Sequence, residues 1–504
     1  MSNSFRPSYA GQAALFALLG LISGCQGQDK APQSRDKTPG TLPNFIVFDI
    51  DSMRLDRLDE SRRADTPALH SLVDRGVVFD AAYSSSGWTA PSLATLLLGA
   101  FPILERKHAG RGRAWFPTIQ GVPTLPEVLG YYGYDTTAFW GGDGDGLLVG
   151  SSEIFGTSHK WARDHTASYD RDITTWLEQS AEPPFFALVH NLDLHRPGPP
   201  RMHDPSGPGA EPQPDCVPEA FGPQARQRTI DLGPEESVQH LIERYDCALI
   251  CYDLSVARVL AALEATGLAG NTVVVLTSNH GELLREHDVF GHELLYEPVL
   301  HIPFVVVDPQ DPEPRHVSEP VELQDLAPTL LSWAGATVPR EMDGRSLLPL
   351  LNRSGPIEPL TEQFALTNRG NAAIRAEGYK LIRADDSLVD GPNLHALSER
   401  PRSGAWIELY DLEADPDELV DLAAERPELA SELDARLGAW VEPRYAERGQ
   451  PPSAMDGDLE RALKERGYWE TVAEPGAERK PPPPGAEREP PPPGAVEPQL
   501  GVLD

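Results

Sequence analysis

Residues 43–58 read PNFIVFDIDSMRLDRL. The apolar run at residues 45–50 has the length and the β-branched and aromatic content of a strand that is buried on both faces. Two carboxylates, Asp49 and Asp51, stand at the end of this run. In doubly wound sheets, ligands bind beyond the carboxyl ends of the strands. The stretch therefore predicts a central strand of an α/β sheet that delivers acidic side chains to a site.

Strand and helix signals alternate along the rest of the chain. Further buried strands are predicted at residues 77–79, 136–140, 185–190 and 272–278. Helices are predicted at residues 66–76, 91–98, 126–132 and 239–267. This alternation predicts a mainly parallel sheet that is covered by helices on both faces. Short strands at residues 379–382 and 407–410 and a helix at residues 427–440 predict a smaller C-terminal α+β unit.

The composition limits the classes of partner. The 504 residues include 43 Lys and Arg against 77 Asp and Glu, which gives a net charge of −34. So acidic a chain is not expected to bind nucleic acid, because neutralising phosphates needs a basic surface. The 50 Pro residues are partly concentrated in residues 197–234, predicted to be a surface loop, and in a Pro-rich C-terminal repeat, predicted to be disordered.

The N-terminal segment resembles an export signal. The apolar run at residues 13–22 is too short to span a bilayer and has the length of a signal-peptide core. It ends in LISGC, which resembles a bacterial lipobox and implies that Cys25 is lipidated. We therefore expect an exported lipoprotein that is tethered to a membrane of the cell envelope. The alternative is an ordinary signal peptide in which Cys25 stands by chance.

Three further cysteines remain for an oxidising compartment. Cys216 can bridge to Cys247 or to Cys251, which leaves one thiol over, and the sequence does not choose between these pairings. No cysteine metal site is predicted, because the spacing lacks a second Cys or His pair.

Polar side chains follow three of the predicted strands. Asp51 follows the first, Asp193 and His195 follow the strand at 185–190, and Asn279 and His280 follow the strand at 272–278. Oxygen and nitrogen donors of this kind suit a divalent metal ion. A single Asp at a strand end is more commonly a helix cap or a hydrogen-bond hub. Three such sets at one edge of the sheet indicate a metal site.

Thr89 adds a candidate nucleophile. It lies in SGWTAPS, just before a predicted helix, where backbone N–H groups and the helix dipole favour phosphate or sulfate. A Thr hydroxyl becomes a competent nucleophile when a base or a metal activates it. The alternative is that Thr89 merely caps the helix.

Taken together, these segments resemble sulfatases and their relatives in the alkaline-phosphatase superfamily. The resemblance runs in order through about residues 43–440: PNFIVFDIDSMRLDRL, TPALHSLVDRGVVF, WTAPSLATLLLGAFP, NLDLHRP, TSNHGELLREHDVFGHELLYEPVLHIPFVV, VELQDLAPTLLSWAGATVPREMDGRSLLPLL, YKLI and ELYDLEADPDELVDLA. It implies a large, mainly parallel sheet between helices with a smaller C-terminal α+β subdomain. The expected organisation is a lipoprotein signal peptide, a linker, a catalytic domain, a C-terminal subdomain and an acidic tail, at residues 1–25, 26–42, 43–355, 356–445 and 446–504.

The resemblance also implies roles for individual residues. Asp51 matches a metal-binding Asp, and Thr89 matches the nucleophile, which also faces the metal. Asn279 and His280 stand where relatives place the last two ligands of the divalent ion, which is Ca, Mn, Mg or Zn. His195 and His292 match histidines that contact the transferred group. Asp193 either serves the metal or orients His195.

The chain departs from the sulfatase pattern at the nucleophile. Sulfatases carry Cys or Ser there, with Pro two residues later and Arg four residues later, and the side chain is oxidised to formylglycine. Here the positions hold Thr89, Pro91 and Leu93. Oxidation of a Thr would give a ketone, so the hydrated aldehyde that releases sulfate is excluded. An unmodified Thr can still act as in phosphodiesterase and phosphoglycerol-transferase relatives, by in-line attack on phosphorus.

Further departures reduce the charge of the site. Asn279 replaces the more usual Asp, and His301 stands where relatives usually have Arg. Residues 140–143, WGGD, lack the lysine and histidine that relatives carry there. With fewer cations, a doubly charged oxyanion is expected to be held less tightly, so the site is either reduced in activity or favours a singly charged diester.

The expected function is therefore that of an exported, metal-dependent hydrolase that uses Thr89 on phospho-, phosphono- or sulfate esters of a small molecule, glycan or lipid. Two alternatives stay open. One is an inactive sulfatase-like binding or scaffold protein of the envelope. The other is a transferase that moves a phospho-headgroup to an acceptor alcohol.

Overall fold

The computed structural model describes residues 42–109, 112–118, 123–141, 154–161, 169–195, 235–292, 294–311, 313–367, 370–384, 394–396 and 406–445. Several predictions fall outside these residues. They are the signal peptide with Cys25, the linker up to residue 41, Cys216, the Pro-rich segment at residues 197–234 and the tail at residues 446–504.

An eight-stranded sheet forms the centre of the described part, in the order β13-β2-β12-β9-β1-β8-β6-β7. Its strands are β1 Asn44–Ile50, β2 Val77–Phe79, β6 Asp135–Gly141, β7 Thr157–Trp161, β8 Phe185–Asn191, β9 Thr272–Thr277, β12 Phe304–Val307 and β13 Arg315–Val317. β1 lies in the middle and runs parallel to both β8 and β9. β12 runs antiparallel to β9 and β2, so the sheet is mixed but mostly parallel, which confirms the predicted fold class.

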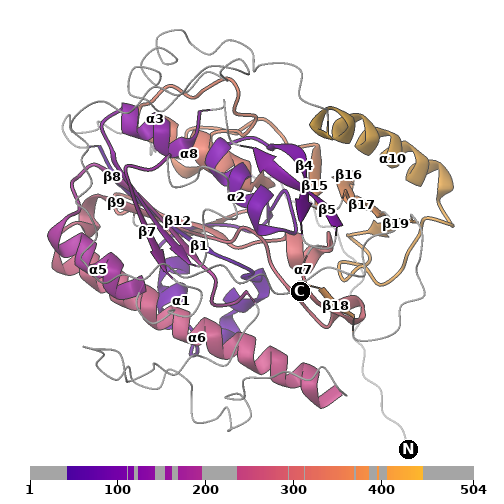
Figure 1. Ribbon diagram of the computed structural model, residues 1–504, viewed down its shortest axis with the longest axis horizontal. Coiled ribbons are helices and arrows are strands. Elements are labelled where there is room, and N and C mark those ends of the chain that lie inside the picture. Colours follow the sequence, from indigo (N-terminus) through magenta and orange to yellow (C-terminus); the bar gives the residue numbers. More distant parts are fainter. Residues whose placement is uncertain are drawn as a thin grey trace, which may run out of the picture. The chain divides into compact units, whose positions relative to one another are not determined.

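Helices cover both faces of this sheet (Figure 1). One face carries α2 Thr89–Leu98, α3 Leu125–Tyr131, α8 Leu326–Trp333 and α9 Leu348–Leu351. The other carries α1 Pro67–Val73, α5 Tyr169–Gln179 and α6 Glu235–Ala265. Alternate residues of β1 enter the two cores, which explains why its apolar run is continuous.

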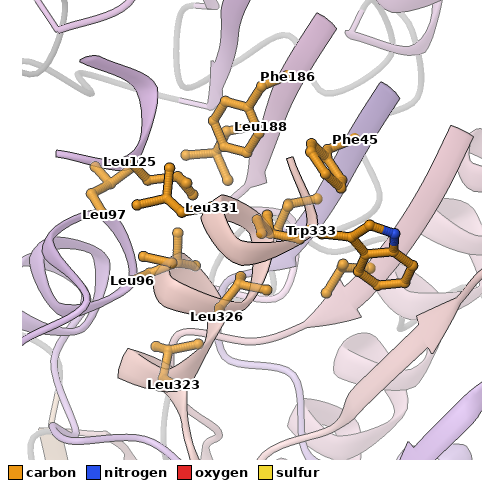
Figure 2. Close-up of a cluster of buried hydrophobic side chains, with 14 of the residues drawn as sticks. Phe45, Leu96, Leu97, Leu125, Phe186, Leu188, Leu323, Leu326, Leu331 and Trp333 are labelled. Carbon is orange, nitrogen blue, oxygen red and sulfur yellow. The ribbon is translucent and has the colours of Figure 1, made fainter. Parts of the chain in front are cut away.

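The core under α2 holds this helix against the sheet. Phe45 and Phe186 of the sheet pack with Leu96 and Leu97 of α2 and with Trp333 of α8, as Figure 2 shows. The rings of Phe45 and Trp333 meet edge to face at a centroid distance of 6.3 Å. Full burial of each such side chain stabilises the fold by about 1.5–3 kcal/mol. This packing fixes α2, whose first residue is Thr89.

A second, four-stranded antiparallel sheet lies in the C-terminal part, in the order β15-β16-β17-β19. Its strands are β15 Glu362–Leu366, β16 Ala372–Ala376, β17 Tyr379–Ala384 and β19 Trp406–Asp411, and α10 Pro427–Val441 packs on it. The short strands and the helix predicted for this region are confirmed. The remaining elements are β3 Ala82–Tyr83, β4 Ile103–Ala109, β5 Gly112–Thr118, β10 Leu283–Leu284, β11 Val289–Gly291, α7 Glu297–Leu300, β14 Val321–Glu322 and β18 Leu394–Ala396.

The two described cysteines settle which thiol of α6 is oxidised. Cys251 is disulfide-bonded, whereas Cys247 is a buried free thiol. In the part of the chain that the structure describes, no helix combines the length and apolar character needed to cross a membrane.

Candidate active site

The apolar rows on the α2 face of the sheet change to polar residues at the carboxyl ends of three neighbouring strands. On β1 the row of Phe45 and Val47 continues into Asp49. The corresponding rows of β8 and β9 lead to His190 and to Asn279, two residues beyond Thr277. Because residues of equal parity share a face of a strand, all three rows deliver polar groups toward the start of α2.

The turn after β1 fixes Asp51, which is completely buried. Its backbone N–H donates to the carbonyl oxygen of Asn191 at 2.9 Å. The next residue, Ser52, has a φ of 65°, in the left-handed region that non-glycine residues seldom occupy. The hydroxyl of Tyr245 donates to the carbonyl oxygen of Ser52 at 2.7 Å and accepts from the N–H of Arg54 at 3.0 Å. These bonds hold the turn, and hence the Asp51 carboxylate, in one orientation.

The Thr89 hydroxyl faces this carboxylate and does not cap α2. The N-cap is Trp88, with no side-chain cap bond, so α2 begins two residues before the predicted start. The prediction placed Pro91 at the first position, but a helix tolerates Pro anywhere in its first turn. Oγ1 of Thr89 lies 3.2 Å from Oδ2 of Asp51 and 3.1 Å from Nε2 of His280. A side chain at Gly87 would overlap the carbonyl oxygen of Leu294, so this approach to α2 requires glycine.

Asn279 and His280 follow β9 directly. Nε2 of His280 lies 3.3 Å from Oδ1 of Asp51, and its Nδ1 lies 2.9 Å from the carbonyl oxygen of Gly281. Oδ1 of Asn279 accepts from the N–H of His280 at 3.0 Å, and its main-chain oxygen accepts from the hydroxyl of Ser84. Nδ2 of Asn279 is buried without a hydrogen-bond partner among the described residues. The four predicted metal-site residues therefore lie at one end of the sheet, and direct contacts join Asp51, Thr89 and His280.

Two further predicted residues extend the cluster as a row of imidazole rings. The centroids of His280 and His292 are 4.6 Å apart, and those of His195 and His292 are 4.9 Å apart. Nδ1 of His292 lies 3.0 Å from Oε2 of Glu282, a buried acid to which the sequence analysis gave no role. Its position two residues after a predicted ligand is the signal that could have found it.

Burial and the histidines set the charges of the cluster. Burial alone would raise the pKa of Asp51, but the neighbouring histidines, His195 and His280 foremost, lower this pKa to about 2. Burial lowers the pKa of His195 to about 4. Near neutral pH Asp51 is therefore ionised and His195 is uncharged.

Asp193 and His301, which the sequence analysis also considered, form hydrogen bonds with residues other than Asp51, Thr89 and His280. Asp193 is half-buried, and its carboxylate accepts from Nδ2 of Asn191 at 3.1 Å. Burial raises the pKa of Asp193 to about 7. His301 stacks on the ring of Tyr83 at 4.8 Å, and its Nε2 lies 2.8 Å from the carbonyl oxygen of Asp80.

The sequence predicts Asp49 at the end of the first strand, but His190, the last residue of the strand predicted at residues 185–190, was not paired with it. They are partners in the β1–β8 register, and Nδ1 of His190 lies 2.8 Å from Oδ2 of Asp49. Nε2 of His190 lies 4.0 Å from Oδ2 of Asp51. Burial lowers the pKa of His190, but the hydrogen bond to Asp49 and the negative charges of Asp49 and Asp51 together outweigh burial and leave this pKa raised. Their shared face on adjacent parallel strands was the available signal.

The donor set can be tested against the divalent ion that the sequence predicts. Within the described residues, no group of three or more His, Cys, Asp and Glu is arranged to hold a metal ion. The predicted set has two such residues, Asp51 and His280, and is completed by Thr89 and Asn279. Nδ2 of Asn279 is a buried polar atom without a partner among the described residues, and its Oδ1, which accepts from the N–H of His280, keeps a second lone pair that could bind an ion. In donor chemistry these four side chains fit a divalent ion.

Comparison with known proteins agrees with this fold. The model of the sulfatase family matches residues 43–336, and the model described as N-sulphoglucosamine sulphohydrolase, C-terminal, matches residues 285–440. A mostly parallel sheet between helices, with a smaller C-terminal sheet, is the fold of alkaline-phosphatase-like ester hydrolases. The chain belongs to the sulfatase family and is a sulfatase-like ester hydrolase.

The relatives and solved structures described next cover between 38% and 82% of this chain. Arylsulfatase K of Xenopus laevis is 25% identical over 454 residues, which cover 79% of this chain and 82% of that protein. Arylsulfatase K of Gallus gallus is 33% identical over 200 residues, which cover 38% of this chain and 35% of its own. A structure with its substrate D-glucosamine-2-N,6-O-disulfate has a TM-score of 0.59 at 18% identity, covering 82% of this chain and all of that one. Phosphonate monoester hydrolase of Agrobacterium radiobacter has a TM-score of 0.56 at 19% identity, covering 80% and 96%.

Proposed function

We propose that this protein is a metal-dependent hydrolase that uses the unmodified Thr89 hydroxyl as its nucleophile on phosphate or phosphonate esters. One observation carries the proposal. Thr89 is 2% exposed. Its hydroxyl makes no capping bond and lies within 3.2 Å of both the Asp51 carboxylate and the His280 imidazole. A hydroxyl that served only the helix would face the N–H groups of the first turn.

The residues that would hold the ion are Asp51, Asn279 and His280, together with the hydroxyl of Thr89. When bound, a divalent ion lowers the pKa of a neighbouring hydroxyl and offsets negative charge that develops on the ester oxygens. Thr89 stands at the first position of a ten-residue helix, where the partial positive charge of the helix end favours an anionic ester.

Two histidines, His195 and His292, lie beside the residues that would hold the ion. His195 is uncharged near neutral pH because burial lowers its pKa to about 4, so it can accept a proton from an approaching group. Nδ1 of His292 is paired with Glu282, which fixes the ring and its tautomer. We assign both rings to contact with the transferred group.

The side chain at position 89 favours the hydrolysis of phosphorus esters over that of sulfate esters. A Thr at position 89 cannot yield the aldehyde on which the sulfatase elimination depends. The contacts of His301 with Tyr83 and Asp80 also leave this position without the cation expected there. A singly charged diester or phosphonate monoester suits such a site, and the fold is shared with phosphonate monoester hydrolases. Sulfate esters of small molecules or glycans are the second candidate, because several structures of the same fold are sulfatases.

We also propose that the protein is exported and anchored in the cell envelope through a lipid on Cys25. The support is the sequence LISGC after the apolar run at residues 13–22. Its substrate would then be an ester that reaches the envelope.

The test is an activity panel with matched nucleophile variants. Wild type, Thr89→Ala and Thr89→Ser are assayed on an aryl phosphodiester, phosphonate, phosphomonoester and sulfate, each with Mn²⁺, Zn²⁺, Ca²⁺ or Mg²⁺. Wild type should turn over the diester or phosphonate, Thr89→Ser should keep part of this activity, and Thr89→Ala should lose it with an unchanged circular dichroism spectrum. Full activity in Thr89→Ala refutes the nucleophile. No turnover by metal-loaded wild type favours the scaffold alternative, and a product carried by an added alcohol favours the transferase.

A further inference from the structure

The inference concerns a buried Asp–His pair that adjoins the proposed metal site. Asp49 and His190 are directly opposite each other on β1 and β8, and neither is exposed to solvent. The 2.8 Å contact between Oδ2 of Asp49 and Nδ1 of His190 fixes the rotation of the imidazole. Trp140 packs edge to face on the same ring at a centroid distance of 5.8 Å. The pair is thus rigidly placed at the carboxyl end of the two strands.

The other side of the imidazole has an unmet requirement. Nε2 of His190 is buried and has no hydrogen-bond partner in the described part of the chain. It lies 4.0 Å from Oδ2 of Asp51, the same oxygen that lies 3.2 Å from the Thr89 hydroxyl. Oδ1 of Asp49 is likewise buried without a partner. A buried polar atom that lacks a partner is costly, so a native site that keeps one usually serves another ligand.

We propose that His190 is an additional ligand of the divalent ion, oriented by Asp49 from behind. This rests on the proposed function, which places an ion at Asp51. Histidines that bind metals usually donate their second ring N–H to a carboxylate, which fixes the tautomer and makes the ligating nitrogen more basic. The Asp49–His190 contact has this form, and Nε2 is the free ligating atom.

The proposal explains how the site tolerates a neutral residue at position 279. Asn279 is neutral and supplies no negative charge to a bound ion. The carboxylate of Asp49 would supply one indirectly, because only the imidazole ring of His190 would separate it from the ion. Two imidazole donors, His190 and His280, also change the expected metal. Imidazole suits Zn²⁺, whereas Ca²⁺ and Mg²⁺ prefer oxygen ligands. The site is therefore selective for Zn²⁺ over Ca²⁺.

The experiment measures metal binding without any substrate. The full chain is stripped of metal, and Zn²⁺ affinity is measured by chelator competition for wild type, His190→Gln and Asp49→Asn. The matched control is His70→Gln, which alters a histidine that is as deeply buried but bonds to Thr66 and Asp59. Asp49→Asn should weaken Zn²⁺ binding by about 10- to 100-fold, His190→Gln should weaken it at least as much and abolish the preference over Ca²⁺, and His70→Gln should not change it.

A second measurement does not depend on any variant folding. X-ray absorption of wild type loaded with one equivalent of Zn²⁺ counts the coordinated imidazoles. Two or more imidazoles support the proposal, and a single one overturns it, as does wild-type Zn²⁺ affinity in a folded His190→Gln. If Asp51→Asn abolishes binding while His190→Gln does not, the proposed function stands and this inference fails. If wild type binds no ion at all, both fail.

Discussion

Replacing Lys380 by Met should strongly destabilise the C-terminal part of the protein. Lys380 is 1% exposed, and its Nζ lies 3.0 Å from Oε1 of Glu297 and 2.7 Å from Oε1 of Glu418. Glu297 begins α7, the short helix that follows His292, and Arg375 binds its other oxygen at 2.7 Å. The pairs therefore join the four-stranded sheet to the segment that carries a predicted site residue.

The magnitude follows from the pKa of Glu297. Burial alone would raise it, but Lys380 and Arg375 outweigh burial and lower the pKa from 4.5 to about 2. A shift of this size corresponds to about 3 kcal/mol of interaction with the charged form. Because Lys380→Met also leaves the buried Glu418 without a cation, we expect a loss of about 3–5 kcal/mol near neutral pH.

The sign of the pH dependence is fixed by the same shift. A carboxyl whose pKa is depressed in the folded state stabilises the protein above about pH 4.5, and this contribution is lost as the pH falls toward the folded-state value. The deficit of Lys380→Met should therefore be largest near neutral pH and shrink in acid.

The assay is equilibrium urea unfolding, followed by tryptophan fluorescence, with Arg436→Met as the matched control. Arg436 contacts three carboxylates on the same sheet and α10, but its side chain is 27% exposed, so its loss should cost at most about 1 kcal/mol. Equal losses in the two variants, or a loss in Lys380→Met that does not shrink in acid, would refute the reasoning.

Three further variants test other parts of the structure. Asp51→Asn should bind the divalent ion more weakly, so that adding Mn²⁺ or Zn²⁺ raises its melting temperature less than that of wild type; an equal rise contradicts the assignment. Burial raises the pKa of Glu322 from 4.5 to about 8, so the wild-type protein loses stability as the pH rises between these two values. Glu322→Gln has a side chain that stays neutral, so this variant should have a higher melting temperature than wild type at about pH 8 but not at about pH 5. Phe186 is fully buried under α2, and Phe186→Ala should cost about 3–5 kcal/mol of unfolding free energy in urea, whereas a cost below about 1 kcal/mol would contradict the packing in Figure 2.

Much of the central sheet could be predicted because its strands carry strong local signals. The runs at β1, β8 and β9 are apolar at nearly every position, as burial on both faces requires. The antiparallel direction of β12 was not predicted, because strand direction depends on the chain path between strands. The hairpin of β4 and β5 was missed for a different reason. Its first strand reads ILERKHA, whose charges do not resemble a buried strand.

The residues of the candidate site could be predicted where a single sequence segment was enough to identify them. Asp51, Thr89 and His280 are in direct contact, as a metal site at this edge requires, and His195 and His292 join them through ring contacts. Their catalytic and metal-binding roles stay predictions. The pair of Asp49 with His190 could not be read from either segment alone. It depends on the register of β1 with β8, which only the folded sheet defines.

The most direct test of the account is to identify the group that becomes esterified during turnover. Metal-loaded wild type is mixed with an aryl phosphonate or phosphodiester, quenched in acid within the first turnover, and digested for mass spectrometry. The account predicts an unoxidised Thr89 in the resting enzyme, and the phosphoryl or phosphonyl group of the substrate on Thr89 in the quenched sample. Turnover without any adduct on Thr89, together with undiminished turnover by Thr89→Ala, would contradict it.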